Sequence, residues 1–160
     1  MITQAQLKEI FSYADGNLVW LKPASNRVQP GDIAGNYDNS SGYIKIGFQG
    51  KRHYAHRLIY IYHHGKLPTM IDHINRDRTD NHIENLRPTT HSKNRANSIR
   101  TTTGHRGISF HKHSGLWHAK ITIDGKVRSL KYFKTQEEAQ AVYDAAAIAH
   151  FGDHSALKGL

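Results

Sequence analysis

The chain contains no cysteine among its 160 residues. Disulfide frameworks, thiolate zinc fingers, iron–sulfur sites and cysteine nucleophiles are therefore excluded. It also lacks any apolar run approaching the roughly 18–20 residues that a membrane-spanning helix requires. The opening residues, Met1-Ile2-Thr3-Gln4, do not show the basic-then-apolar pattern of a signal peptide. These absences lead us to expect a soluble protein of the cytoplasm.

Acidic side chains are few compared with basic ones. The chain has 13 Asp and Glu against 22 Lys and Arg, a formal charge of +9, and all 13 histidines follow residue 50. Residues 51–100 alone hold ten basic and four acidic side chains. A merely solvated basic surface is one interpretation. The concentration of charge in one stretch favours a polyanionic partner instead, above all nucleic acid.

The pattern of apolar and turn-forming residues predicts an α+β protein of two units, 1–98 and 105–160. Residues 99–104 are polar and aperiodic, so we expect a linker there. The first unit is expected to contain a helix capped by Thr3, a strand at 18–21, a hairpin beginning at 43–48 and a helix at 55–64. The second is expected to contain three strands and a long helix, at 107–110, 117–123, 127–133 and 136–151.

A stretch of polar residues begins after residue 70. Asp72 and His73 end a short predicted strand, a second strand follows around Leu86, and Thr90 can cap a helix. A hairpin packed on that helix would bring Asp72 and Asn94 together beside His73. Carboxylate and amide oxygens suit a hard octahedral cation such as magnesium. His73, with a reference pKa of about 6.5, could accept a proton from water.

The order Asp-His, eleven residues, Asn, eight residues, Asn resembles the HNH endonucleases of the ββα-metal fold, in their phage (bacteriophage) and homing branch. The segments Ala55-His56-Arg57-Leu58-Ile59, Gly65-Lys66-Leu67-Pro68 and Asp80-Asn81 to Arg87 also resemble that family. The resemblance covers about residues 40–98, and the first forty residues fit the lead-in of the family less strictly. The last position is Asn rather than the His of the family name, as is usual in the homing branch.

The resemblance implies a role for each matching residue. Asp72 and Asn94 would be the metal ligands, for Mg²⁺ or alternatively Mn²⁺. His73 would be the general base that activates water for in-line attack on a DNA phosphodiester, giving a 5′-phosphate and a 3′-hydroxyl. Asn85 would tie the hairpin loop together and orient the histidine.

Other histidines have competing interpretations. At the start of the predicted helix, His56-Arg57 could contact phosphate, or His56 could be a buried, hydrogen-bonded histidine. His91 and Asn97 could support the site, touch DNA phosphate or face solvent. His82 and His63-His64 are expected to be exposed polar residues. No histidine pair has convincing zinc-ligand spacing.

Residues 104–154 resemble an AP2 DNA-binding domain. The matching segments are Arg106-Gly107-Ile108, Trp117-His118-Ala119-Lys120-Ile121, Tyr132-Phe133-Lys134-Thr135 and the helix residues Glu137 to Ala146. The resemblance implies a three-stranded sheet laid on the major groove of DNA, with a helix on its other face. The strand residues expected to face DNA are Arg106, Ser109, His111, Lys120, Thr122, Arg128 and Leu130. Arg106, Lys120 and Arg128 are the cations suited to phosphate or guanine, whereas Trp117 is more consistent with a core position.

These features together predict a metal-dependent DNA endonuclease of homing type, joined to a targeting domain and acting on double-stranded DNA. No heptad pattern or large apolar face argues for an obligate partner, so we expect a monomer or a weak dimer. Two alternatives remain open. One is a non-catalytic, sequence-specific DNA-binding regulator that retains the ββα scaffold, and the other is a restriction or packaging nuclease.

Overall fold

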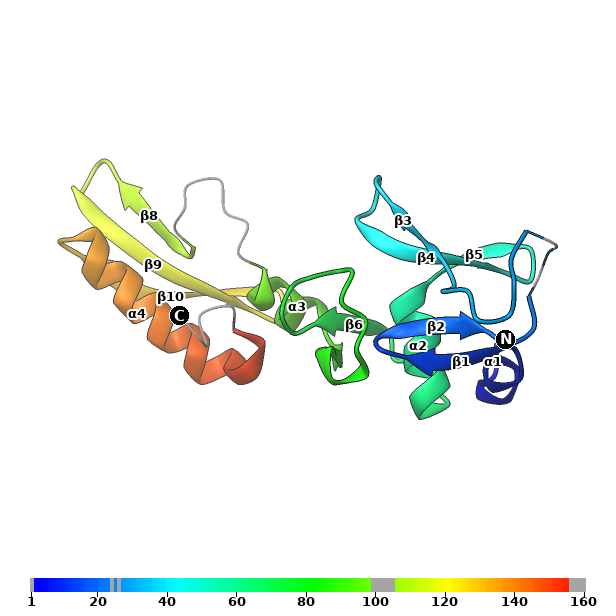
Figure 1. Cartoon of the computed structure of the whole chain (residues 1–160). Coiled ribbons are helices and arrows are strands. Elements are labelled where there is room, and N and C mark those ends of the chain that lie inside the picture. The colour runs from blue at the N-terminus through cyan, green and yellow to red at the C-terminus, as the bar shows by residue number, and fades with distance from the viewer. Residues whose placement is uncertain (1, 24, 26, 99–105, 156–160) are drawn as a thin grey trace. The chain divides into compact units, whose positions relative to one another are not determined.

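The computed structural model describes residues 2–23, 25, 27–98 and 106–155, which form two compact units, Met1–Thr89 and Thr90–Leu160 (Figure 1). The expected linker at 99–104 lies outside the described residues. The boundary between the two units falls at Thr89–Thr90, before the helix that begins at residue 91. That helix therefore belongs to the second unit rather than to the first, where the sequence pattern places it. No helix in the described part of the chain is long and apolar enough to cross a membrane.

The first unit consists of two helices and three small antiparallel sheets. Strand β1 pairs with β2, β4 lies between β3 and β5, and β6 pairs with β7. In chain order the elements are α1 (Gln4–Ile10), β1 (Phe11–Ala14), β2 (Asn17–Trp20), β3 (Asn36–Asp38), β4 (Tyr43–Phe48), β5 (Lys51–Tyr54), α2 (Ala55–His64), β6 (Met70–His73), the 3₁₀ turn η1 (Ile83–Asn85) and β7 (Leu86–Thr89).

Local signals set the ends of the two helices. The Thr3 side chain accepts a hydrogen bond from the Gln6 backbone, and the Gln6 side chain accepts one from Thr3 N–H, which completes a capping box. Helix α2 ends at Gly65, whose φ of 72° lies in the left-handed region. The apolar face of α2, with Leu58 and Ile59 buried, packs into the main core of the unit. These ends confirm the predicted helices.

The β6–β7 hairpin extends from this core. Its register pairs His73 with Leu86 and Asp72 with Arg87. Leu86 is buried in the core cluster, so the hydrophobic effect fixes the end of the hairpin where His73 lies. The polar residues of β6 are therefore held by a short ladder whose position depends on core packing.

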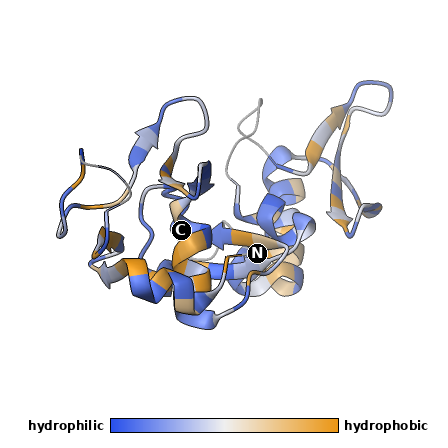
Figure 2. Ribbon diagram, turned by 90° about the vertical axis from the view of Figure 1, so that its right-hand side faces the viewer, coloured by the Kyte–Doolittle hydropathy of each residue, from blue (hydrophilic) through white to orange (hydrophobic). Residues whose placement is uncertain are grey.

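The second unit contains a three-stranded antiparallel sheet of order β10–β9–β8 and two helices. Its elements are α3 (His91–Asn97), β8 (Ile108–His111), β9 (Leu116–Ile123), β10 (Lys126–Phe133), α4 (Gln136–Phe151) and the 3₁₀ turn η2 (Gly152–His154). A capping box of Thr135 and Glu138 begins α4, as predicted. Ile121, Tyr143 and Phe151 form the core together with Ala96 of α3. Hydrophobic and hydrophilic residues alternate along the strands and helices of the chain (Figure 2).

The mixed helix and antiparallel-sheet architecture confirms the α+β expectation. Two short strands, β1 and β3, were not predicted from the sequence. Phe11 fits the apolar spacing of the preceding helix, yet it is the residue after that helix and begins β1. The turn at Asp15-Gly16 returns the chain so that β1 pairs with β2, and this pairing outweighs the local helical pattern.

Gly107 offers a test of packing in the second unit. Its φ is 70°, and an added Cβ would collide with the ring of Tyr143. Gly115 has a similar φ of 68° but no atom within 4 Å of an added Cβ. We expect Gly115→Ala to cost about 1–2 kcal/mol from left-handed backbone strain alone. Gly107→Ala should cost about 1–3 kcal/mol more because of overpacking. Calorimetric unfolding of the two variants measures the difference, and equal losses would contradict this packing.

Candidate active site

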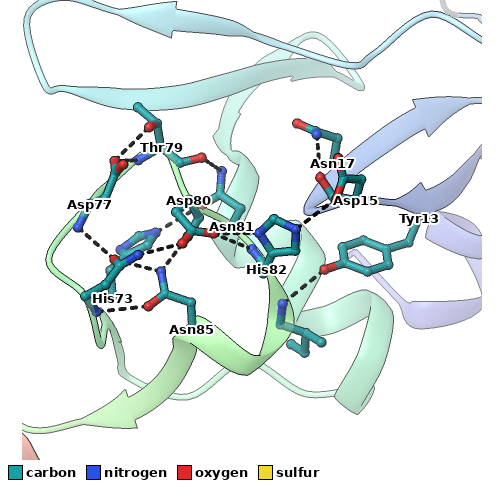
Figure 3. Close-up of polar contacts among 12 residues, drawn as sticks. Tyr13, Asp15, Asn17, His73, Asp77, Thr79, Asp80, Asn81, His82 and Asn85 are labelled. Carbon is teal, nitrogen blue, oxygen red and sulfur yellow. Dashed lines mark hydrogen bonds and ion pairs between the residues drawn. The ribbon is translucent and has the colours of Figure 1, made fainter.

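His73 is the last residue of β6 and only 4% exposed. Its Nε2 lies 3.1 Å from Oδ1 of Asn81, as Figure 3 shows. The Asn81 side-chain nitrogen donates to the Thr79 carbonyl, so the amide oxygen is the atom that faces the ring. Nε2–H must therefore donate to Asn81. The lone pair is then on Nδ1, which is the ring atom able to accept a proton.

Aromatic rings surround His73. Its ring centroid lies 5.1 Å from that of His56, edge to face, and 6.0 Å from that of Tyr43. His56 in turn stacks on Tyr54. Burial, with smaller contributions from His73 and Arg57, lowers the pKa of His56 to about 3. His56 is only 8% exposed. Of its two interpretations, the structure therefore favours a buried histidine over a phosphate contact.

Burial also lowers the pKa of His73 below its ordinary value. The hydrogen bond to Asn81 and the negative charge of Asp72 raise the pKa and so oppose this effect in part. His73 is consequently neutral at neutral pH, the form that a general base needs before it accepts a proton.

Asp72 is buried beside Arg87, its cross-strand partner. Oδ2 of Asp72 accepts hydrogen bonds from Nε and Nη2 of Arg87, at 3.1 and 2.9 Å. The guanidinium compensates a carboxylate charge that would be costly to bury alone. A cation bound by Asp72 would therefore share this carboxylate with Arg87.

Asn85 ties together the loop between β6 and η1. Its side-chain nitrogen donates to Oδ1 of Asn75 and to the Asp80 carbonyl, at 2.9 and 2.8 Å. Its side-chain oxygen accepts from the Asn75 backbone at 2.9 Å. The first half of the role implied for Asn85 is thus visible in its contacts. The residue that accepts a hydrogen bond from the His73 ring is Asn81 rather than Asn85, and the sequence pattern gave Asn81 no role.

His82 joins the same loop to the β1–β2 turn. Its Nδ1 lies 2.7 Å from Oδ1 of Asp80, and its Nε2 lies 3.2 Å from Oδ1 of Asp15 (Figure 3). The hydrogen bonds to Asp80 and Asp15 raise the pKa of His82 above its ordinary value. His82 is exposed, as expected, yet its ring pairs with two carboxylates.

Asn94 lies on α3, in the second unit. Thr90 caps this helix as predicted, accepting from the Lys93 backbone. Ser92 accepts a hydrogen bond from the Asp124 backbone, and Arg106 donates to the carbonyls of Ala96 and Ser98. Among the described residues, no group of three or more His, Asp or Glu side chains could hold a metal ion. Asp72, in the first unit, and Asn94, in the second, each carry a side-chain oxygen of the kind that magnesium prefers.

The structure separates the cations expected to contact DNA. Arg106 is engaged with the carbonyls at the end of α3. Lys120 is exposed and pairs with Ser129, whereas Arg128 pairs with Ile121, which is buried against α4. Since cross-strand partners share a face, Lys120 and Arg128 lie on opposite faces of the sheet.

Three further expected positions differ in their surroundings. Leu130 lies at a register irregularity between Ser129 and Lys131. Trp117 shares the face of Ala119 and Ile121, yet it is only half-buried and its ring packs against the exposed Phe110. Arg57 is half-buried on α2, in the first unit.

The raised pKa of His82 predicts a pH-dependent contribution to stability. A histidine whose pKa is higher in the folded state stabilises fully below its unfolded value, about 6.5, and loses this contribution as pH rises through the folded value. We expect the difference in unfolding midpoint between wild type and His82→Gln to be largest near pH 5.5 and to shrink by pH 8.5. Urea unfolding at both pH values measures it. A difference that is constant, or that grows with pH, would contradict the ion-pair assignment.

Two known proteins are similar to this chain. "Uncharacterized HNH endonuclease L560" of Acanthamoeba polyphaga mimivirus is 28% identical over 123 residues, which cover 75% of this chain and 64% of that protein. "Ethylene-responsive transcription factor WRI1" of Arabidopsis thaliana is 43% identical over 58 residues, covering 33% of this chain and 13% of the factor. The chain thus spans less than two thirds of either relative. No solved structure shows a significant match.

One family matches the central part of the chain. Its description is HNH endonuclease, and the match extends over residues 53–96. This segment contains α2, the β6–β7 hairpin and nearly all of α3, and hence His73, Asp72, Asn85 and Asn94. Residues 53–96 therefore match the HNH endonuclease family.

Proposed function

We propose that the protein is a metal-dependent DNA endonuclease in which His73 is the general base. The observation that carries this proposal is the state of the His73 ring. It is buried, this burial lowers its pKa, its Nε2 pairs with the Asn81 oxygen, and it lies next to Asp72 within the segment that matches the HNH family. A ring fixed in one tautomer with a lone pair on Nδ1 is suited to take a proton from water.

In the proposed reaction, Nδ1 of His73 removes a proton as the water oxygen attacks phosphorus in line. The bond between phosphorus and the 3′-oxygen breaks, and that oxygen takes up a proton from solvent. The products are a 5′-phosphate and a 3′-hydroxyl. The Asn81 oxygen and the Asp72 carboxylate lie where they stabilise the imidazolium that forms. Asn85 acts as a positioning residue, because it holds the loop that carries Asn81.

We assign Asp72 and Asn94 as the ligands of a divalent metal ion, Mg²⁺ or alternatively Mn²⁺. Their oxygens match the preference of such a hard cation. When bound, the ion would polarise the scissile phosphate and stabilise the leaving oxygen. Asp72 would hold it with the carboxylate that also accepts hydrogen bonds from Arg87.

We also propose that the second unit is a DNA-targeting, AP2-like domain. The segment similar to a plant transcription factor supports this role, as does the exposed position of Lys120 on the sheet face away from α4. We also propose DNA contacts by Arg106 and Arg128 of this unit and by Arg57 of the first unit. Arg106 already donates a hydrogen bond to a carbonyl of α3. We propose that the protein acts on double-stranded DNA as a monomer or weak dimer. Its role would be that of a homing endonuclease in the cytoplasm of a phage-infected host.

A plasmid-cleavage assay tests the chemistry. We expect wild type to cut DNA with Mg²⁺ and not with EDTA. His73→Ala should lower the rate about a hundredfold or more, the usual contribution of a general base. His64→Ala, which removes an exposed histidine of α2, serves as the matched control and should cut normally. Cleavage that persists in His73→Ala would refute the mechanism. Binding without any cleavage by wild type would favour the alternative of a non-catalytic DNA-binding regulator.

Two lysine and arginine variants test the targeting face. If the sheet face away from α4 contacts DNA, Lys120→Ala should weaken binding to the preferred site by about 1–3 kcal/mol. Arg128→Ala, which removes one charge from the opposite face, should have a smaller effect. Titration of labelled duplex DNA measures both affinities. If Arg128→Ala loses more affinity than Lys120→Ala, the DNA contact would instead lie on the sheet face that carries α4.

A further inference from the structure

A groove in the first unit is lined by β5, α2 and the segment that follows α2. Its volume is about 870 Å³. The charged side chains that line it are all basic, and none of its described lining residues is Asp or Glu; they are Lys51, Arg52, Arg57 and Lys66. The floor is apolar, with Leu58, Ile61 and Leu67. We call this feature the basic groove.

The basic groove is distinct from the candidate active site. None of its lining residues belongs to the segment 70–97, which carries Asp72, His73 and Asn94. On α2, His56 packs against His73, whereas Arg57 and Ile61 line the groove. Successive residues of a helix are rotated by about 100°, so α2 presents the groove and the His73 cluster on different sides.

The charges of the groove are largely uncompensated within the described part of the chain. Lys51, Arg57 and Lys66 have no ion-pair partner among the described residues. Arg52 is 62% exposed and reaches Asp38 only at 4.0 Å, while Lys45 lies 2.8 Å from the same carboxylate. Four like charges around one hollow repel each other. Such an arrangement is expected where a polyanion supplies the opposite charge.

The lining aromatic residues indicate which part of a nucleic acid fits. One face of the Tyr54 ring is stacked on His56, and Lys45 lies over this ring at 5.2 Å. His53 packs against Phe48, and its Nε2 donates to the Phe48 carbonyl. Proteins that bind unpaired strands present open aromatic faces on which bases stack, whereas these two rings already contact His56, Lys45 and Phe48. The basic rim and apolar floor instead match the phosphates and deoxyriboses of a backbone.

We propose that the basic groove binds the sugar–phosphate backbone of duplex DNA, independently of sequence, at a position flanking the cut. The identification of the polyanion as DNA rests on the proposed function. The groove would thus supply affinity from the nuclease unit itself, separately from the sheet of the second unit.

The test compares two triple variants of the full chain with the same change of net charge. Lys51→Gln/Arg52→Gln/Lys66→Gln neutralises the groove. Lys8→Gln/Lys22→Gln/Arg27→Gln neutralises three exposed cations of the same unit outside it. Affinity for a random-sequence duplex is measured in EDTA over a range of salt concentrations, so that no cleavage is needed. Circular dichroism confirms that both variants are folded.

Each lost phosphate contact reduces the slope of log K against log salt by about 0.9. We expect the groove variant to lose about 2–3 in slope and to bind at least about tenfold more weakly at 0.1 M salt. The control variant should change by less than about one in slope. If wild type binds and shows this difference but never cuts DNA, the groove assignment stands while the nuclease proposal fails.

Four results would overturn the assignment. Equal losses in the two variants would show only a general charge effect. A loss confined to a single strand of the same length would assign the groove to unpaired nucleotides. Unchanged duplex binding together with lost binding to poly-glutamate would assign it to an acidic peptide. Absence of any duplex binding by wild type would refute it as well.

Discussion

The hydrogen bond from His73 to Asn81 sets the orientation of a buried ring within the segment that matches the HNH family. It fixes the tautomer of a buried ring and leaves Nδ1 with its lone pair. The rest of the loop is organised around this bond. Asn85 holds the loop through Asn75 and Asp80, and His82 ties it to the turn between β1 and β2. Contacts of Asn85 and His82 thus hold the loop in which the Asn81 oxygen faces Nε2 of His73.

Burial and charge act on this ring in opposite directions. Removal from water lowers the pKa of His73, while Asp72 and Asn81 favour its protonated form. The net effect is a lowered pKa, although both neighbours favour the protonated ring. Arg87 is part of the same balance, because it makes burial of the Asp72 carboxylate tolerable. A hydrophobic replacement of Arg87 would remove both hydrogen bonds that the guanidinium donates to that carboxylate.

The sequence predicted the elements that depend on local signals. The caps at Thr3, Thr90 and Thr135 and the stop at Gly65 are short-range features, and the structure has all of them. The division of the chain and the role of Arg106 depend on tertiary packing, which local patterns do not contain. Arg106 resembles a DNA-contacting residue by position, yet its guanidinium binds carbonyls at the end of α3.

The same limit applies to the faces of the second sheet. Arg128 and Lys120 were expected on one face, but pairing with Ile121 and Ser129 places them on opposite faces. A shift of one residue in register reverses every side chain of a strand, and an irregularity at Leu130 breaks the simple alternation. Charge alone therefore overestimates the DNA-facing set of that sheet. In the basic groove of the first unit, the sequence pattern underestimates the clustering of charge. Its cations are spread over residues 51–66 and come together through the packing of β5 on α2.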